Sequence, residues 1–211
     1  SREKDINFIY PYRELENYKK SGLLYWKNDT HWNDYGAFIG TDILIREIKK
    51  DFPEIELLEE KQYRKDLKKL DINGDLSRLL GISVEKYKGV EYYQFIRKED
   101  YSFSIVKVNN TDLNIQPDEN FNFYTFLGDK VYIRTSSPKR LKVLVLRDSF
   151  GIPMVQYLSE TFGEVEYIHT GNLNELQEKI ISEKPDIIIH EVVGRYLERL
   201  GNDVPALREV N

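Results

Sequence analysis

Ser149 stands where a serine hydroxyl can act as a nucleophile. It lies in the turn Arg147-Asp148-Ser149-Phe150, between the apolar run 141–146 and a helical pattern. At such a strand-to-helix turn the hydroxyl projects into a crevice, and the first amides of the helix can stabilise a developing negative charge. Gly151 keeps the turn open. A serine here also fits the role of a plain helix N-cap, so the turn by itself leaves both interpretations open.

A serine nucleophile needs a base, and the base needs a group that orients it. The chain has only three histidines. His31 follows Asp29 by two residues, so on a tight turn the carboxylate can reach the imidazole; an incidental histidine in an Asn-Asp-Thr turn is the alternative. His169, at a strand end, is the competing base. His190 lies inside a buried strand and fits a hydrogen-bonded core position.

The last third of the chain contains the elements that must position Ser149. The run 141–146 is apolar apart from Lys142, which is typical of a strand buried on both faces. A helix over 152–162, a strand over 165–169, a helix marked by residues 173–181 and a strand over 186–190 complete a βαβαβ pattern. We expect parallel strands, with Ser149, Thr170-Gly171 and Glu191 at one sheet edge.

The first two thirds are less regular. The sequence predicts a strand over 6–10, a helix over 12–20 and a long amphipathic helix capped by Asn33 or Asp34 and closed by Pro53. Residues 54–82 are charged and favour helical or irregular structure. Four short β-rich runs, at 92–96, 103–108, 121–126 and 131–134, predict a meandering antiparallel insertion over about 90–135.

Composition restricts the partners. The net charge of −5, with basic and acidic residues interleaved, argues against a nucleic-acid partner. The chain has no cysteine and no paired-histidine motif, so we expect no metal site, and nothing in the sequence calls for a cofactor. The missing cysteines also fit an extracytoplasmic location. No apolar run is long enough for a membrane span.

Two segments together resemble a known family. The stretch Asp29-Thr30-His31-Trp32-Asn33, with Gly36-Ala37, resembles the Asp-Thr-His-Trp-Asn-x-x-Gly-Ala motif of the alginate O-acetyltransferase family (AlgX/AlgJ-like) and its DHHW relatives. Asp148-Ser149-Phe150 resembles the Asp-Ser-Phe turn of the same family. Gly74-Asp75-Leu76 with Leu80-Gly81 resembles a third segment, and the order of the three along the chain is that of the family.

The resemblance implies an α/β, SGNH-hydrolase-like three-layer fold with a mainly parallel sheet flanked by helices, as one domain over 1–211. Carried over by position, Ser149 is the nucleophile, His31 the general base and Asp29 its orienting partner. The resemblance also implies an O-acetyltransferase acting on an extracytoplasmic polysaccharide, with an acyl donor, possible transfer from a membrane acyl-transfer partner protein, and an N-terminal membrane anchor outside residues 1–211.

Three departures from the family pattern stand out. Arg147 replaces a small residue, Val193-Gly194-Arg195 stands where relatives often have Glu-Arg, and the chain begins after the family's early strand. For the oxyanion hole we expect the Ser149 N–H, with Gly171 or Asn172 as a second donor, although Asn172 equally fits a helix cap. Arg147 could contact an anionic glycan or pair with Glu191.

Three functions therefore stay open at this point. The first is a serine-dependent O-acyltransferase. The second is an SGNH-type carbohydrate esterase, which shares the acyl-serine but passes the acyl group to water. The third is an inactive glycan-binding component of a polysaccharide export complex. The distance between the Ser149 hydroxyl and the His31 ring weighs most between the active and inactive alternatives.

Overall fold

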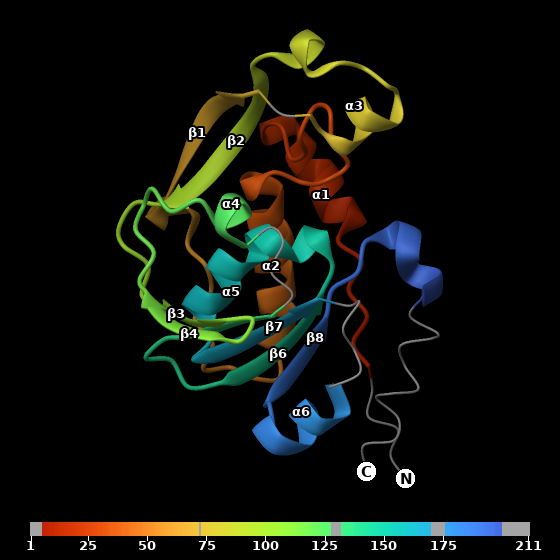
Figure 1. Ribbon diagram of the computed structural model, residues 1–211. Coiled ribbons are helices and arrows are strands. Elements are labelled where there is room, and N and C mark those ends of the chain that lie inside the picture. Colours follow the sequence, from red (N-terminus) through yellow and green to blue (C-terminus); the bar gives the residue numbers. More distant parts are fainter. Residues whose placement is uncertain (1–5, 72, 128–131, 170–175, 200–211) are drawn as a thin grey trace.

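The computed structural model describes residues 6–71, 73–127, 132–169 and 176–199, and its centre is a six-stranded sheet (Figure 1). The strand order is β4-β3-β5-β7-β6-β8, and two further strands, β1 and β2, form a separate two-stranded antiparallel sheet. The chain is thus an α/β fold with two sheets. The strands are β1 Tyr63–Leu70, β2 Val90–Arg97, β3 Ser104–Val108, β4 Thr111–Ile115, β5 Tyr132–Ser136, β6 Lys142–Arg147, β7 Glu164–His169 and β8 Ile187–His190.

The parallel part of the sheet is the part that the βαβαβ pattern predicts. Strand β6 pairs in parallel with β7 on one side and with β8 on the other. Its central residues 143–146 are all apolar and buried because both faces of the strand are covered. Val143 and Val145 belong to the large core cluster, while Leu144 and Leu146 belong to a smaller cluster on the opposite face.

The expectation of a mainly parallel sheet is wrong, because the six-stranded sheet is mixed. Strand β5 runs antiparallel to β7, and β3 is antiparallel to both β5 and β4. Strands β3 and β4 are joined only by Asn109 and Asn110, with Asn109 at φ 50. So short a connection permits only a hairpin, so β3 and β4 must be antiparallel.

Helices cover both faces of the sheet. The large cluster packs β-strand side chains against α2 and α5, and the smaller one packs Leu176 and Ile180 of α6 against β6 and β7. Within the described residues, no helix combines the length and apolar character needed to cross a bilayer. The helices are α1 Tyr12–Tyr18, α2 Asp34–Ile48, α3 Asp75–Leu79, α4 Phe123–Leu127, α5 Val155–Thr161 and α6 Leu176–Glu183, with 3₁₀ turns η1 Lys19–Ser21, η2 Glu60–Gln62, η3 Val84–Tyr87, η4 Ser149–Met154 and η6 Gly194–Arg199.

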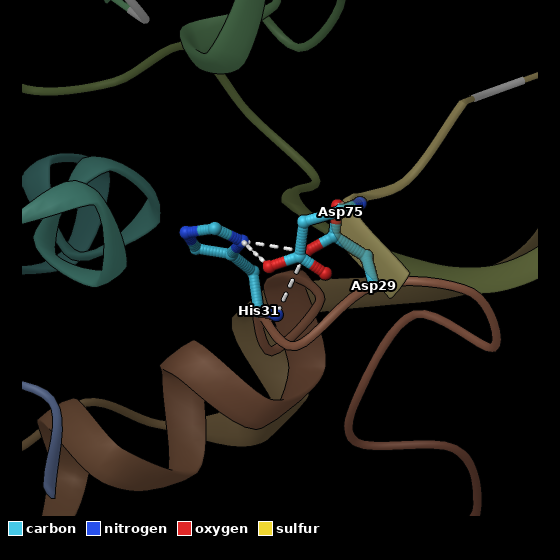
Figure 2. Close-up of side chains that lie close together, drawn as sticks. All are labelled: Asp29, His31 and Asp75. Carbon is cyan, nitrogen blue, oxygen red and sulfur yellow. Dashed lines mark hydrogen bonds and ion pairs between the residues drawn. The ribbon is translucent and has the colours of Figure 1, made fainter. Parts of the chain in front are cut away.

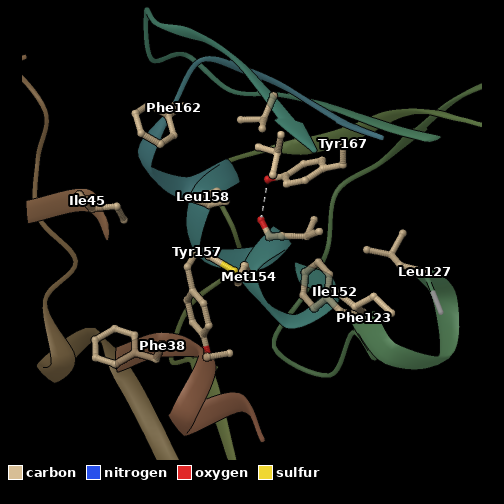
Figure 3. Packing of buried hydrophobic residues seen from close by; sticks show 14 of the residues in the cluster. Phe38, Ile45, Phe123, Leu127, Ile152, Met154, Tyr157, Leu158, Phe162 and Tyr167 are labelled. Carbon is tan, nitrogen blue, oxygen red and sulfur yellow. Dashed lines mark hydrogen bonds between the residues drawn. The ribbon is translucent and has the colours of Figure 1, made fainter. Parts of the chain in front are cut away.

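The helix α5 is buried on all sides and anchors the serine turn that precedes it. Every residue of α5 is buried, and Tyr157 and Leu158 are fully enclosed (Figure 3). The Tyr157 hydroxyl donates hydrogen bonds to the carbonyls of Asp34, 3.0 Å away, and Phe95, 2.9 Å away. The turn that carries Ser149 is therefore fixed to the start of α2 and to β2.

Three other local predictions are wrong. Residues 6–10 form no strand; Ile6 and Phe8 are 83% and 68% exposed. The charged region 54–82 contains β1, whose polar pattern hid it because only Tyr63 at its start is buried. The run 121–126 contains the helical turn α4, for which the Asn122 side chain accepts a hydrogen bond from the Thr125 N–H at 2.9 Å.

Candidate active site

A short hairpin presents Asp29 and His31. Tyr25 and Trp32 form an isolated antiparallel bridge, and the Trp26 N–H donates to the His31 carbonyl at 3.2 Å. Directly after the hairpin, the Asn33 side chain accepts from the Gly36 N–H at 3.1 Å and so caps α2, as predicted. The tight turn between the bridged residues and the capped helix gives this segment a fixed shape.

Within the turn, the Asp29 carboxylate binds the His31 ring. Its Oδ1 lies 2.5 Å from His31 Nδ1 and also accepts from the His31 backbone N–H at 2.9 Å. Burial alone would raise the pKa of Asp29, but the hydrogen bonds from His31 and from the Asp75 N–H outweigh it and lower that pKa to about 2. An ionised carboxylate can only accept, so Nδ1 carries a proton, and in the neutral imidazole this leaves the lone pair of Nε2 as the acceptor.

A second carboxylate, Asp75 at the start of α3, supports the turn from the other side (Figure 2). Its Oδ1 accepts from the Thr30 N–H at 2.7 Å, its Oδ2 accepts from the Thr30 hydroxyl, and its own N–H donates to Asp29 Oδ2 at 2.9 Å. The Gly74-Asp75 segment was noted in the sequence only as part of the resemblance. A role for Asp75 at the site could not be read from spacing, because 45 residues separate it from Thr30.

Close approach of two backbones explains the glycine before Asp75. A Cβ on Gly74 would lie 2.1 Å from the Asn28 carbonyl oxygen and 2.9 Å from Asp29 Cβ. Both contacts are impossible for a real side chain, and the first is with backbone that cannot swing away. Gly74 thus lets α3 begin directly against the Asp29 turn.

The serine turn is held by its own set of polar contacts. Asp148 caps η4: its Oδ1 accepts from the Phe150 N–H at 2.7 Å, and its Oδ2 accepts from the Val193 N–H at 2.8 Å. The Asp148 N–H donates to Glu191 Oε2 at 3.1 Å. Burial, together with the Asp148 carboxylate, raises the pKa of Glu191 well above its usual value. Glu191 therefore does lie at the edge where Ser149 begins η4.

Ser149 and His31 meet across 118 residues of sequence. The Ser149 hydroxyl lies 2.7 Å from His31 Nε2, the nitrogen whose lone pair is free. The ring also packs against Phe150, with centroids 4.5 Å apart, and the indole Nε1 of Trp32 donates to the Phe150 carbonyl at 2.8 Å. The arrangement Asp29–His31–Ser149 can therefore remove the hydroxyl proton as the oxygen attacks an electrophile.

The other residues singled out in the sequence have different positions. Arg147 is fully buried; its Nη1 donates to the Asp148 carbonyl at 3.2 Å and Glu191 lies close, so its position matches pairing rather than contact with a glycan. Burial lowers the pKa of Arg147 against the effect of Glu191. His169 lies beside Arg147 in the sheet register. Gly171 and Asn172 lie outside the described residues.

The Asp29, His31 and Asp75 side chains also have the composition of a cation site. Their ligand atoms all lie within 4.8 Å of one another. However, both oxygens of Asp29 and both of Asp75 already accept hydrogen bonds from N–H or O–H groups. The carboxylate oxygens that could bind a cation are already used to hold the turn and orient the imidazole, and His31 Nε2 points to Ser149. The cluster therefore fits a hydrogen-bond chain better than a metal centre.

A cavity of about 380 Å³ opens beside the serine. Its volume is within the usual range for small-molecule sites. The wall is formed by the Asp29–His31–Ser149 cluster, by aromatic and apolar residues and by polar residues of β2, α4 and α5: Trp26, Asp34, Leu70, Tyr92, Gln94, Ile96, Phe121, Asn122, Phe123, Tyr124, Thr125, Ile152 and Gln156. Sequence reasoning missed Asp34, Trp26 and Tyr92 as members of the site.

Arg195 contacts the site from the segment that departs from the family pattern. Its Nη1 donates to the Thr30 hydroxyl at 3.3 Å, and its guanidinium lies 5.5 Å from the centre of the Phe150 ring. The side chain is exposed and stays outside the wall of the cavity. It therefore places a positive charge near the rim of the site.

Comparison with known proteins gives two kinds of similarity. The family model described as "SGNH hydrolase-like domain, acetyltransferase AlgX" matches residues 2–105, which include Asp29, His31 and Asp75 but end before Ser149. No curated protein matches the chain.

Solved structures share the fold at low identity. A DHHW family protein from Eubacterium siraeum is 14% identical with a TM-score of 0.58, over 83% of this chain and 60% of that one. PatB1 of Bacillus cereus is 18% identical with a TM-score of 0.59, over 83% and 66%; the structure of PatB1 with a sulfonyl adduct gives 17% and 0.60, over 83% and 64%. The chain thus spans less than two thirds of the length of these structures.

Proposed function

The chain carries an AlgX-like SGNH hydrolase-like domain, and on that premise we propose that it is a serine-dependent O-acyltransferase. The acyl group is acetyl, and the acceptor is a hydroxyl of an extracytoplasmic polysaccharide. The proposed roles are nucleophile for Ser149, general base for His31 and orienting carboxylate for Asp29.

The observation that carries this proposal is the unbroken hydrogen-bond chain from Asp29 through His31 to Ser149. Its two distances, 2.5 Å and 2.7 Å, are within reach for direct proton transfer. The low pKa of Asp29 supports the tautomer that leaves His31 Nε2 able to accept. A protein that had lost activity and kept only glycan binding would have no need of this alignment, so the geometry favours the active alternatives.

The first half-reaction forms an acyl-serine. Ser149 Oγ attacks the carbonyl carbon of the acyl donor while its proton passes to His31 Nε2, and Asp29 stabilises the imidazolium. The Ser149 N–H donates a hydrogen bond to the carbonyl oxygen as negative charge develops on it. The bond to the leaving group then breaks, and His31 returns the proton to that group.

The second half-reaction regenerates the serine. A sugar hydroxyl in the cavity gives its proton to His31 as its oxygen attacks the acyl carbon. The bond between that carbon and Ser149 Oγ breaks, and the proton on His31 restores the serine hydroxyl. Exclusion of water from the cavity determines whether the product is an acylated sugar or free acid.

Intact mass measurement after a brief reaction with p-nitrophenyl acetate tests the proposal. We expect the wild-type protein to gain one acetyl group and the Ser149→Ala protein to gain none. Ser182→Ala, which removes an exposed serine of α6, is the matched control and should still acylate. Acetylation of Ser149→Ala at the wild-type rate would overturn the proposal.

A second experiment distinguishes a transferase from an esterase. The acylated protein is mixed with oligosaccharides, and the masses of the products are measured by mass spectrometry. Acetylated oligosaccharide is the expected product, and release of acetate alone at an unchanged rate would support the esterase. A sulfonyl fluoride reagent gives an independent label, since PatB1 has been determined with a sulfonyl adduct.

A further inference from the structure

The charged side chains that line the cavity beside Ser149 are mainly acidic. Among the described residues that form its wall, the acidic side chains are Asp29 and Asp34, the one basic group is the His31 imidazole, and there is no lysine or arginine. The remaining polar groups are amides and hydroxyls. Inside the cavity, a ligand that carries a carboxylate would thus meet acidic side chains and no lysine or arginine to pair with, since Arg195 lies outside the wall, near the rim.

Asp34 places a carboxylate deep in the wall. It is the first residue of α2 and is 6% exposed, with hydrogen bonds to the Phe95 backbone and the Tyr124 hydroxyl. Tyr157 fixes its backbone through the Asp34 carbonyl. Burial raises the pKa of Asp34 to about 7, against these hydrogen bonds. Neither Asp34 nor Tyr124 takes part in the proposed acyl transfer, so their place in the wall needs another explanation.

An aromatic pair forms the adjoining part of the wall. Trp26 and Tyr92 stack with centroids 4.0 Å apart and 24° between their planes, and Tyr124 meets Trp26 edge to face at 6.1 Å. All three line the cavity. Flat rings beside hydrogen-bonding side chains suit a ligand with apolar C–H faces and a rim of hydroxyls.

We infer that this cavity is the acceptor subsite and that it selects an uncharged sugar unit against a uronate, with Asp34 as the residue that determines this specificity. The inference rests on the proposed function for the presence of an acyl-serine next to the subsite. Above about pH 7, where Asp34 is ionised, it repels a sugar carboxylate and accepts hydrogen bonds from sugar hydroxyls, while Trp26 and Tyr92 hold the ring.

Binding to the Ser149→Ala protein tests the inference without acyl transfer. Tryptophan fluorescence is the readout, because Trp26 lines the subsite. The probes are linear tetrasaccharides in matched pairs, each neutral sugar with its uronate, in the manno, gluco and galacto configurations. At pH 8, where Asp34 is ionised, we expect at least one neutral member to bind about tenfold more tightly than its uronate, the ratio that about 1.4 kcal/mol of repulsion produces.

A second measurement introduces Asp34→Asn into the Ser149→Ala protein. We expect it to reduce the neutral-to-uronate ratio at least about threefold by improving uronate binding. The matched control is Asp112→Asn, because the side chain of Asp112 is 86% exposed on β4. It should leave the ratio unchanged.

Two results would overturn the inference. One is a uronate that binds as tightly as its neutral partner in every pair; the other is no fluorescence change with any neutral probe. Failure here is distinguishable from failure of the proposed function, because acylation of wild-type Ser149 by p-nitrophenyl acetate is measured separately and needs no sugar. Should Asp34→Asn fail to fold, the comparison of matched pairs on the Ser149→Ala protein still decides the question.

Discussion

Trp32 donates a hydrogen bond from its indole Nε1 to the carbonyl of Phe150, at 2.8 Å. Each of these residues directly follows a member of the candidate site, His31 in one case and Ser149 in the other. The bond is buried, and the two rings also meet edge to face at 5.7 Å. It fixes the separation of the base and the nucleophile independently of the hydrogen bond between them.

Replacing Trp32 with Phe should show how much the hydrogen bond to the Phe150 carbonyl, as distinct from the packing of the ring, contributes to the positioning of His31 and Ser149. The variant keeps an aromatic ring but leaves the Phe150 carbonyl without this donor, which should cost about 1–3 kcal/mol of unfolding free energy. We expect the acylation rate constant of Ser149 to fall about tenfold, with KM for the acyl donor little changed. Stopped-flow measurement with p-nitrophenyl acetate gives both values.

Tyr167→Phe is the control for Trp32→Phe. It also removes a buried donor to a backbone carbonyl, that of Val155, but neither residue lines the cavity beside Ser149. It should lower stability without slowing acylation. Equal slowing in both variants would mean that loss of stability, and not the link between the two segments, reduces the rate.

Asp29→Asn should affect both catalysis and the pH dependence of stability. The amide can present an N–H to His31 Nδ1 and favour the wrong tautomer, so we expect acylation to slow by about 10³-fold or more. The pKa of Asp29 is lowered in the folded state, so its stabilisation, on the order of 2 kcal/mol, is present above about pH 4 and is lost as pH falls through about 2. Urea unfolding at pH 6 and at pH 3 measures this contribution.

The expected outcome is a smaller stability difference between wild type and Asp29→Asn at pH 3 than at pH 6. A difference that stays constant across this range would contradict the low pKa. Asp112→Asn, in an exposed position on β4, serves again as the reference substitution.

Asp34→Asn should change the pH dependence of folding stability in the direction opposite to that of Asp29→Asn. Because burial raises the pKa of Asp34 to about 7, the folded state holds a proton that the unfolded state loses near pH 4. Wild-type stability therefore falls through this group between about pH 4 and 7, and the variant lacks that loss. We expect the Tm of Asp34→Asn, relative to wild type, to rise on going from pH 4.5 to pH 8. A constant difference in Tm would indicate an ordinary pKa.

Gly74→Ala tests the close approach of α3 to the Asp29 turn. The added Cβ would lie 2.1 Å from the Asn28 carbonyl oxygen, so α3 must move and the hydrogen bond from the Asp75 N–H to Asp29 must lengthen. We expect a loss of about 1–3 kcal/mol in unfolding free energy and slower acylation. Gly194→Ala has open space around its Cβ and should change neither quantity.

The parts of the fold that were predicted correctly are those where local pattern and burial agree. Residues 143–146 are apolar because both faces of β6 are covered, and Asn33 is followed by a helical pattern that it caps. Strand β1 was missed for two reasons. Its partner β2 begins only at Val90, 27 positions after β1 begins at Tyr63, and most residues of β1 are exposed. A pairing of this kind leaves no local signal in a charged segment.

The site was predictable to a similar degree. A histidine two residues from an aspartate, and a serine at a strand end, are visible in the sequence. The contribution of Asp75 was not, since it depends on a contact over 45 positions and on a glycine that permits it. The subsite was also hidden: Trp26 and Tyr92 look like core residues and Asp34 like a helix cap, and only the three-dimensional arrangement places them beside Ser149.

The wide sequence separation of His31 and Ser149 has a consequence for folding. A contact that closes 118 residues of chain forms late, because the loop-closure entropy must be overcome before the contact contributes any stability. The site is then complete only when the first hairpin and the last β-α-β unit have both docked. Recovery of acylation during refolding should therefore lag behind recovery of helical circular dichroism, and it can serve as a kinetic probe of the final docking step.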